Sequence, residues 1–212
     1  MSLTTTSKAS GIALMIGSFL MIITMVLHPV GGDFTHLVRI ITIGRISHII
    51  AIASIPLIAY GFQGLSKSLE STISDIAYFF MLFGLIAVLF AGAVNGLILM
   101  DFVESHRDAS DDVIESLKPF LRLIRSINHA FDFIFIGAVC ISTGIWSALI
   151  IYKKRYAPLI GWLGLLLTSM ALVSLFAGFV FVDLTGFQIF IFGWVAWVIS
   201  LSYQLMIRIS TT

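Results

Sequence analysis

The chain has 212 residues, of which 59% are hydrophobic and only 11% are charged, and its mean hydropathy is +1.08. This composition excludes a soluble globular domain, in which the share of charged residues is about twice as large. The formal net charge of +1 and the single cysteine, Cys140, argue against nucleic-acid binding, an intrachain disulfide and a cysteine-based metal cluster.

Six apolar stretches follow one another along the chain, and each has the roughly 17–25 residues that cross a hydrocarbon core about 30 Å thick. They cover residues 11–27, 46–65, 76–100, 131–152, 158–182 and 187–207. We therefore predict an all-α, polytopic membrane protein with six transmembrane helices in one domain, residues 1–212. The first stretch ends in His28 and Pro29 rather than in a small-residue cleavage pattern, so we interpret it as a retained helix.

Two connecting segments have predictable structure. After the first stretch, Gly31 and Gly32 lead into what we expect to be a short outer loop carrying Asp33, His36 and Arg39. Before the fourth stretch, residues 111–127 carry apolar residues at helical spacing. This spacing predicts an amphipathic helical extension that runs into the fourth transmembrane helix.

The orientation follows from the basic link between the fourth and fifth stretches, which contains Lys153, Lys154 and Arg155. Short basic links stay in the cytoplasm, and alternation then places both termini there as well. We expect a multi-pass protein of the cell membrane, most simply a bacterial inner membrane, with the lipid bilayer as its first partner.

A weak internal repeat relates two pairs of helices. RISH, residues 45–48, opens the second helix, and RSINH, residues 125–129, opens the fourth. LFAG occurs at residues 89–92 in the third helix and at residues 175–178 in the fifth. The matches suggest that helices two and three repeat helices four and five as parallel hairpins, although four-letter apolar matches also arise by chance.

The polar residues of the helices gather at one depth. At 1.5 Å per residue from the cytoplasmic ends, His28, His48, Asn95 and His129 lie about 28–35 Å away, at the outer edge of the hydrocarbon. Helical spacing also puts Arg122, Arg125, His129 and Asp132 on one face of the fourth helix. The candidate ligand-binding residues are therefore His28, Arg45, His48, Asn95, Arg122, Arg125, His129 and Asp132.

Four interpretations of this cluster remain open. We favour a pocket for an anionic or amphipathic small ligand, in which Arg45, Arg122 and Arg125 hold an anionic group by charge-assisted hydrogen bonds. A second is a b-type haem held between His48 and His129, as in an electron-transfer protein.

The third interpretation is a metal-dependent membrane enzyme, so whether the chain is an enzyme is an open question. Its ligands would come from His28, His36, His48, His129, Asp132 and Asp183. In the fourth interpretation, the polar groups only fasten the helix ends together at the membrane interface. We favour a pocket because four or five helices contribute to the cluster while the bilayer centre below it is nearly free of charge.

Residues 141–173 combine an aliphatic helix, a basic turn and a next helix that begins with Pro158, Gly161 and Gly164. This pattern over helices four and five resembles a family of uncharacterised bacterial six-helix membrane proteins, described only as a domain of unknown function. HPVGGDF at residues 28–34 and the helix at residues 45–65 are likewise similar to small bacterial membrane proteins of unassigned role. The resemblance implies a six-helix membrane fold but no activity and no site residue.

Overall fold

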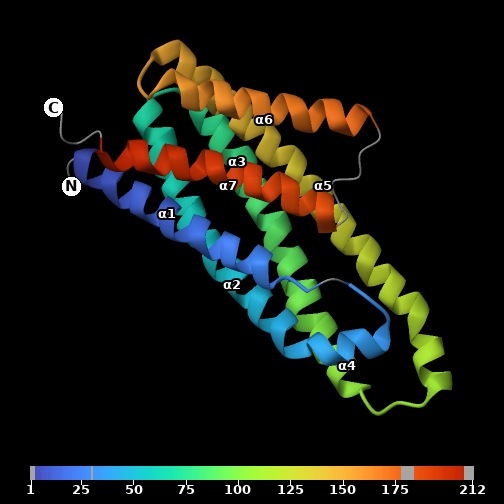
Figure 1. Ribbon diagram of the computed structural model, residues 1–212. Coiled ribbons are helices and arrows are strands. Elements are labelled where there is room, and N and C mark those ends of the chain that lie inside the picture. The colour runs from blue at the N-terminus through green and yellow to red at the C-terminus, as the bar shows by residue number, and fades with distance from the viewer. Residues whose placement is uncertain (1–2, 30, 178–183, 208–212) are drawn as a thin grey trace.

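The computed structural model describes residues 3–29, 31–177 and 184–207, and over these residues the chain is all-α (Figure 1). Its elements are α1 (Leu3–Leu27), α2 (Phe34–Leu69), α3 (Thr72–Ala93), the π-helical turn η1 (Val94–Ile98), α4 (Leu99–Ser105), α5 (Asp111–Lys153), α6 (Pro158–Phe176) and α7 (Leu184–Ile207). Because α3, η1 and α4 run on without a break, the described residues form six continuous helices. The predicted helical fold is confirmed.

Five of these helices are long and apolar enough to cross a membrane. The candidate spans are Ser7–Leu27, Phe34–Leu69, Thr72–Ser105, Asp111–Lys153 and Thr185–Ile207, and a shorter apolar helix covers Pro158–Ser174. These spans indicate a multi-pass membrane protein in contact with the lipid bilayer.

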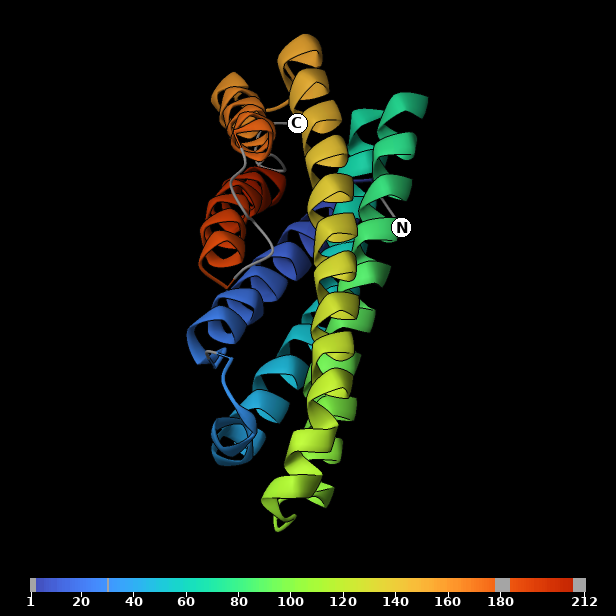
Figure 2. The same cartoon turned by 90° about the vertical axis from the view of Figure 1, so that its right-hand side faces the viewer.

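Two helices are much longer than a membrane crossing. The 36 residues of α2 and the 43 residues of α5 extend over about 54 Å and 65 Å, against about 30 Å of hydrocarbon. Their excess length lies at one end, where they join α4 in the narrow lower part of the molecule (Figures 1 and 2). We call this part, residues 34–47, 99–105 and 111–127, the cap.

The cap has an apolar core of its own. Phe34, Ile41, Met100 and Val103 are buried in it, and Ile114, Leu117 and Leu121 of α5 pack against them. The amphipathic extension predicted for residues 111–127 is therefore confirmed, since it forms the first turns of α5 and places these side chains inward.

The prediction of a short outer loop carrying Asp33, His36 and Arg39 is wrong. Asp33 is the N-cap of α2, and its Oδ1 accepts a hydrogen bond from the backbone N–H of His36 at 2.8 Å. The chain therefore enters a helix directly after Gly32, because Asp33 satisfies a free amide of the first turn and Phe34 and Ile41 gain a buried position in the cap.

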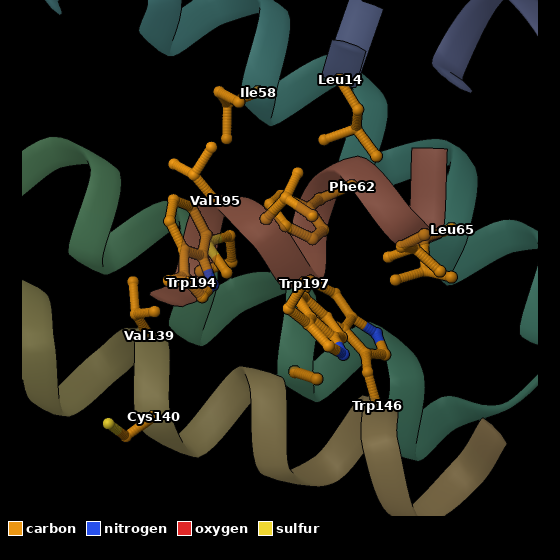
Figure 3. Packing of buried hydrophobic residues seen from close by; sticks show 14 of the residues in the cluster. Leu14, Ile58, Phe62, Leu65, Val139, Cys140, Trp146, Trp194, Val195 and Trp197 are labelled. Atoms are coloured by element: carbon orange, nitrogen blue, oxygen red, sulfur yellow. The ribbon is translucent and has the colours of Figure 1, made fainter. Parts of the chain in front are cut away.

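The opposite end of the bundle holds the main apolar core. Phe62 of α2 stacks on Trp146 of α5, with ring centroids 4.8 Å apart, and lies 5.9 Å from Trp194 of α7 (Figure 3). Both indole N–H groups are satisfied, by Ser74 Oγ at 2.9 Å and by Thr143 Oγ1 at 3.1 Å. This half of the bundle is tightly packed by large apolar side chains.

Two turns meet at this end. Arg155, after α5, pairs with Glu70, after α2, at 2.8 Å, and Lys153 Nζ donates to the carbonyl oxygens of Leu69 and Glu70 at 2.5 and 2.9 Å. The α2–α3 turn and the α5–α6 turn therefore lie side by side. These contacts hold the α2–α3 helix pair and the α5–α6 helix pair at the same height in the bundle. The Arg155 guanidinium holds the pKa of the Glu70 carboxyl below its usual range.

Candidate ligand-binding chamber beside the cap

A cavity of about 360 Å³ lies between α1, α2, α3, α5 and α7, next to the cap. We call this cavity the chamber. Its polar lining is Thr24, His28, His48, Asn95, Asn128, His129 and Asp132, and its apolar lining includes Met25, Ala51, Val88, Ala91 and Phe187. The structure thus brings together five of the eight predicted ligand-binding residues, namely His28, His48, Asn95, His129 and Asp132.

His48 is held rigidly on α2. Its Nδ1 lies 2.7 Å from the carbonyl oxygen of Gly44, one turn earlier. Because a carbonyl can only accept, Nδ1 carries the proton, and Nε2 of the neutral ring is an acceptor. His48 is 8% exposed, so the ring is held by its neighbours, and the residue lines the chamber.

The π-helical turn η1 makes room for His48. A Cβ atom on Gly96 would lie 2.1 Å from His48 Cβ and 2.5 Å from its Cγ, so only glycine fits there. Single π-helical turns inside α-helices occur frequently at functional sites. Here the turn also carries Asn95, the neighbour of Gly96, into the chamber lining.

His28 lies against His48. It follows directly after α1, and its ring centroid is 5.0 Å from that of His48, with the ring planes tilted by 57°. Its Nδ1 lies 3.1 Å from the carbonyl oxygen of Pro29, which again makes Nδ1 the donor and Nε2 the acceptor. Sequence reasoning paired His48 with His129, whereas the ring that contacts His48 is that of His28; His129 lines the same chamber.

A chain of amides joins η1 to α5. Asn95 Nδ2 donates to Asn128 Oδ1, and Asn128 Nδ2 donates to Asp132 Oδ2 at 2.8 Å. Asp132 is only 8% exposed, and the hydrogen bond from Asn128 satisfies one of its two carboxylate oxygens. Sequence reasoning missed Asn128, although its position one turn before Asp132 was a usable signal.

Arg122 and Arg125 lie beyond the chamber, in a second hollow of about 550 Å³. The two cavities share Gly31, Asn95 and Asn128 in their linings. The outer hollow also contains Lys118, which pairs with Glu115, and the acidic residues Asp33 and Asp111. It therefore carries both signs of charge, and its arginines lie on the cap side of the chamber rather than in it.

Arg45 has a different set of partners. Its Nη2 lies 2.5 Å from Asp101 Oδ1 and 2.9 Å from Glu104 Oε2, both on α4. These two ion pairs fasten α2 to α4 within the cap, which is the structural role that the fourth interpretation assigned to the polar residues.

The residues that the third interpretation named as metal ligands are not all brought together. Within the described ranges, no three His, Cys, Asp or Glu side chains are grouped so that they could hold a metal ion. His36 lies in the first turn of α2, in the cap, and Asp183 lies outside the described residues. The second LFAG of the sequence repeat, residues 175–178, also ends outside them, so the duplication stays a prediction.

No protein-family model, curated protein or solved structure matches the chain. The resemblance to a family of uncharacterised bacterial membrane proteins therefore stays a prediction, and the function is argued from the chamber itself.

Proposed function

We propose that the protein binds an amphipathic small molecule whose head donates hydrogen bonds, with the head in the chamber and the tail along its apolar wall. The observation that carries this proposal is the chamber lining. In a bundle whose other half is packed with apolar side chains, four segments bring His28, His48, Asn95, Asn128, His129 and Asp132 to one cavity.

The choice of a donating head comes from side-chain atoms of the chamber that have no hydrogen-bond partner among the described residues. His48 and His28 both commit Nδ1 to a backbone carbonyl, so each neutral ring offers an acceptor at Nε2. Asp132 uses Oδ2 for Asn128 and keeps Oδ1 as a further acceptor. A cavity lined by such acceptors favours a hydroxyl or amine over a purely anionic head, because an acceptor that the ligand covers without a donor loses its hydrogen bond to water.

The size and walls of the chamber suit a small ring with an alkyl tail. Its volume is about 360 Å³, which is near the lower end of the roughly 300–1,000 Å³ found for small-molecule sites. Met25, Val88 and Phe187 supply apolar surface beside the polar groups. A phenol or quinol with an alkyl chain has this combination of donor, ring and tail.

The proposal includes the membrane orientation. With α6 as a sixth span and the basic turn of Lys153, Lys154 and Arg155 in the cytoplasm, both termini are cytoplasmic and the chamber opens at the outer leaflet. An anionic substituent on the ligand would then reach Arg122 and Arg125 in the outer hollow, where charge-assisted hydrogen bonds favour it.

The experiment compares two probes on the full-length protein in detergent: 4-nonylphenol, which donates a hydrogen bond, and its methyl ether, which cannot. We expect the phenol to raise the melting temperature and the ether to do so much less. His48→Phe keeps a ring but removes Nε2, and should weaken phenol binding about tenfold, the worth of one good hydrogen bond.

His106→Phe is the matched control. His106 makes the same kind of bond as His48, from Nδ1 to the carbonyl oxygen of Phe102 at 2.8 Å, and like His48 it follows a serine. It lies at the end of α4, away from the chamber. Equal affinity for phenol and ether, or equal losses in the two histidine variants, would overturn the proposal.

A further inference from the structure

One face of α5 is uncovered along most of its length. The positions concerned are 113, 116, 120, 123, 127, 130, 134, 137 and 141, and all nine side chains or glycine positions are exposed. We call them the α5 stripe. The steps between them alternate between three and four residues, which places all nine on one face of the helix and is also the spacing along the contact of paired helices. Figure 2 shows α5 at the front of the molecule, with no other helix over its near side.

Four of the five stripe positions in the cap are apolar, the exception being Ser116, and this part of the stripe does not face lipid. Val113, Phe120, Leu123 and Ile127 are 38–55% exposed. Their segment, residues 111–127, also carries Asp, Glu, Lys and Arg side chains at six positions, and these cannot lie in hydrocarbon without a large penalty. The cap core therefore stands outside the bilayer, where these four side chains keep part of their apolar surface exposed, although Phe120 also contacts Phe102 of α4, with ring centroids 4.5 Å apart.

The part of the stripe in the membrane is made of small and aliphatic residues in turn: Ala130, Ile134, Gly137 and Ile141. A Cβ on Gly137 would have no atom within 4 Å, so the packing of this chain does not require glycine there. Glycine is unfavourable in a helix interior, but it permits the close approach of a second helix in a membrane.

We propose that the α5 stripe is the contact between two copies of this chain, arranged as a parallel pair about a twofold axis along the membrane normal. Two copies share one orientation in the membrane, so a heptad stripe meets its own equivalent. From Leu117 to Ala138, the flanking positions are Leu117, Ile124, Phe131 and Ala138 on one side and Pro119, Ser126 and Phe133 on the other. None is charged, so no like charges oppose each other across the pair.

The available area agrees with a weak contact between two copies. The stripe is about 42 Å long and one helix face wide, so two copies would bury on the order of 900 Å² in total, an area in the range of weak and transient interfaces. A second copy would cover both the part of the stripe in the cap, which faces water, and the part in the membrane, which contains Gly137. Lipid could cover only the part in the membrane.

Cysteine cross-linking tests the pairing directly. In the full chain with Cys140→Ala, single cysteines at Leu123, Ala130 and Gly137 should cross-link in membranes about tenfold more than cysteines at two exposed positions off the stripe. These controls are Arg39 in the cap and Phe79 on the lipid-facing side of α3, which is 68% exposed. Equal yields at stripe and control positions would contradict the proposal.

A second measurement separates pairing from folding. Gly137→Leu adds bulk on the stripe at a position where a Cβ meets no described atom within 4 Å, so it should convert dimers to monomers in native mass spectra without lowering the melting temperature of the monomer. Phe79→Leu, a change of an exposed side chain on another lipid-facing helix, should leave the dimer intact. A wild-type protein that is monomeric in lipid nanodiscs would overturn the inference.

Discussion

Gly96→Ala is the perturbation for which the structure gives the clearest magnitude. The added methyl group would lie 2.1 Å from His48 Cβ and 2.5 Å from Cγ, whereas carbon atoms in contact are ordinarily about 3.5–4.0 Å apart. The atoms in the way are Cβ and Cγ of a buried side chain, which cannot move without the backbone. To restore an ordinary carbon–carbon distance, η1 and α2 must therefore separate by more than about 1 Å.

Overpacking of this kind costs about 1–3 kcal/mol, and alanine returns up to about 1 kcal/mol through its higher helix propensity. We expect a net loss of about 1–2 kcal/mol, together with weaker binding of 4-nonylphenol because the ring of His48 is displaced.

Thermal unfolding in detergent, followed by tryptophan fluorescence, measures the loss of stability. The matched control is Gly144→Ala on α5, where the nearest atom to the new Cβ is Thr168 Oγ1 at an ordinary 3.9 Å. This variant should be as stable as the parent or more stable. If the Gly96→Ala protein has the same melting temperature as the Gly144→Ala protein and binds the phenol normally, the close contact between η1 and His48 is refuted.

Three further predictions concern the ion pairs and the orientation. Arg45→Gln removes two solvent-accessible ion pairs and should cost less than about 1 kcal/mol, a difference that shrinks at high salt while phenol binding is unchanged; a clear loss of binding would place Arg45 in the site. Because Arg155 lowers the pKa of Glu70, this pair stabilises the fold above the ordinary pKa of a carboxyl and is lost as the pH falls through the lowered value. Melting temperatures between pH 7 and pH 3 should therefore fall more steeply for the parent than for Glu70→Gln, and parallel curves would contradict the pairing. A cysteine at Lys154, in a Cys140→Ala background, should resist membrane-impermeant reagents added outside intact cells, and labelling there would reverse the orientation.

Hydrophobicity was enough to predict the helices but not their ends. The cost of exposing a backbone to lipid fixes only the part of each helix inside the hydrocarbon, so the turns of α2 beyond it were expected to be a loop. A usable signal was present: Asp33 is a good N-cap residue, and Phe34, Leu37, Val38 and Ile41 have helical spacing.

Depth counting located most of the chamber because helical rise converts sequence position into height. It could not assign direction around each helix or the partner that each side chain meets. Arg45 points to the acidic residues of α4, and Arg122 and Arg125 lie in the outer hollow. The contact of His28 with His48 depends on how α1 packs on α2, and this packing cannot be predicted from the sequence of either helix alone.

Photolabelling tests the central claim, ligand binding in the chamber, most directly. The probe is an alkylphenol that carries a diazirine on its tail, and the labelled peptides of the full-length protein are mapped by mass spectrometry. We expect labels on the apolar chamber wall, at Met25, Val88 or Phe187, and we expect excess 4-nonylphenol to suppress them and His48→Phe to reduce them. Labels spread over lipid-facing residues such as Phe79, undiminished by competitor, would contradict it.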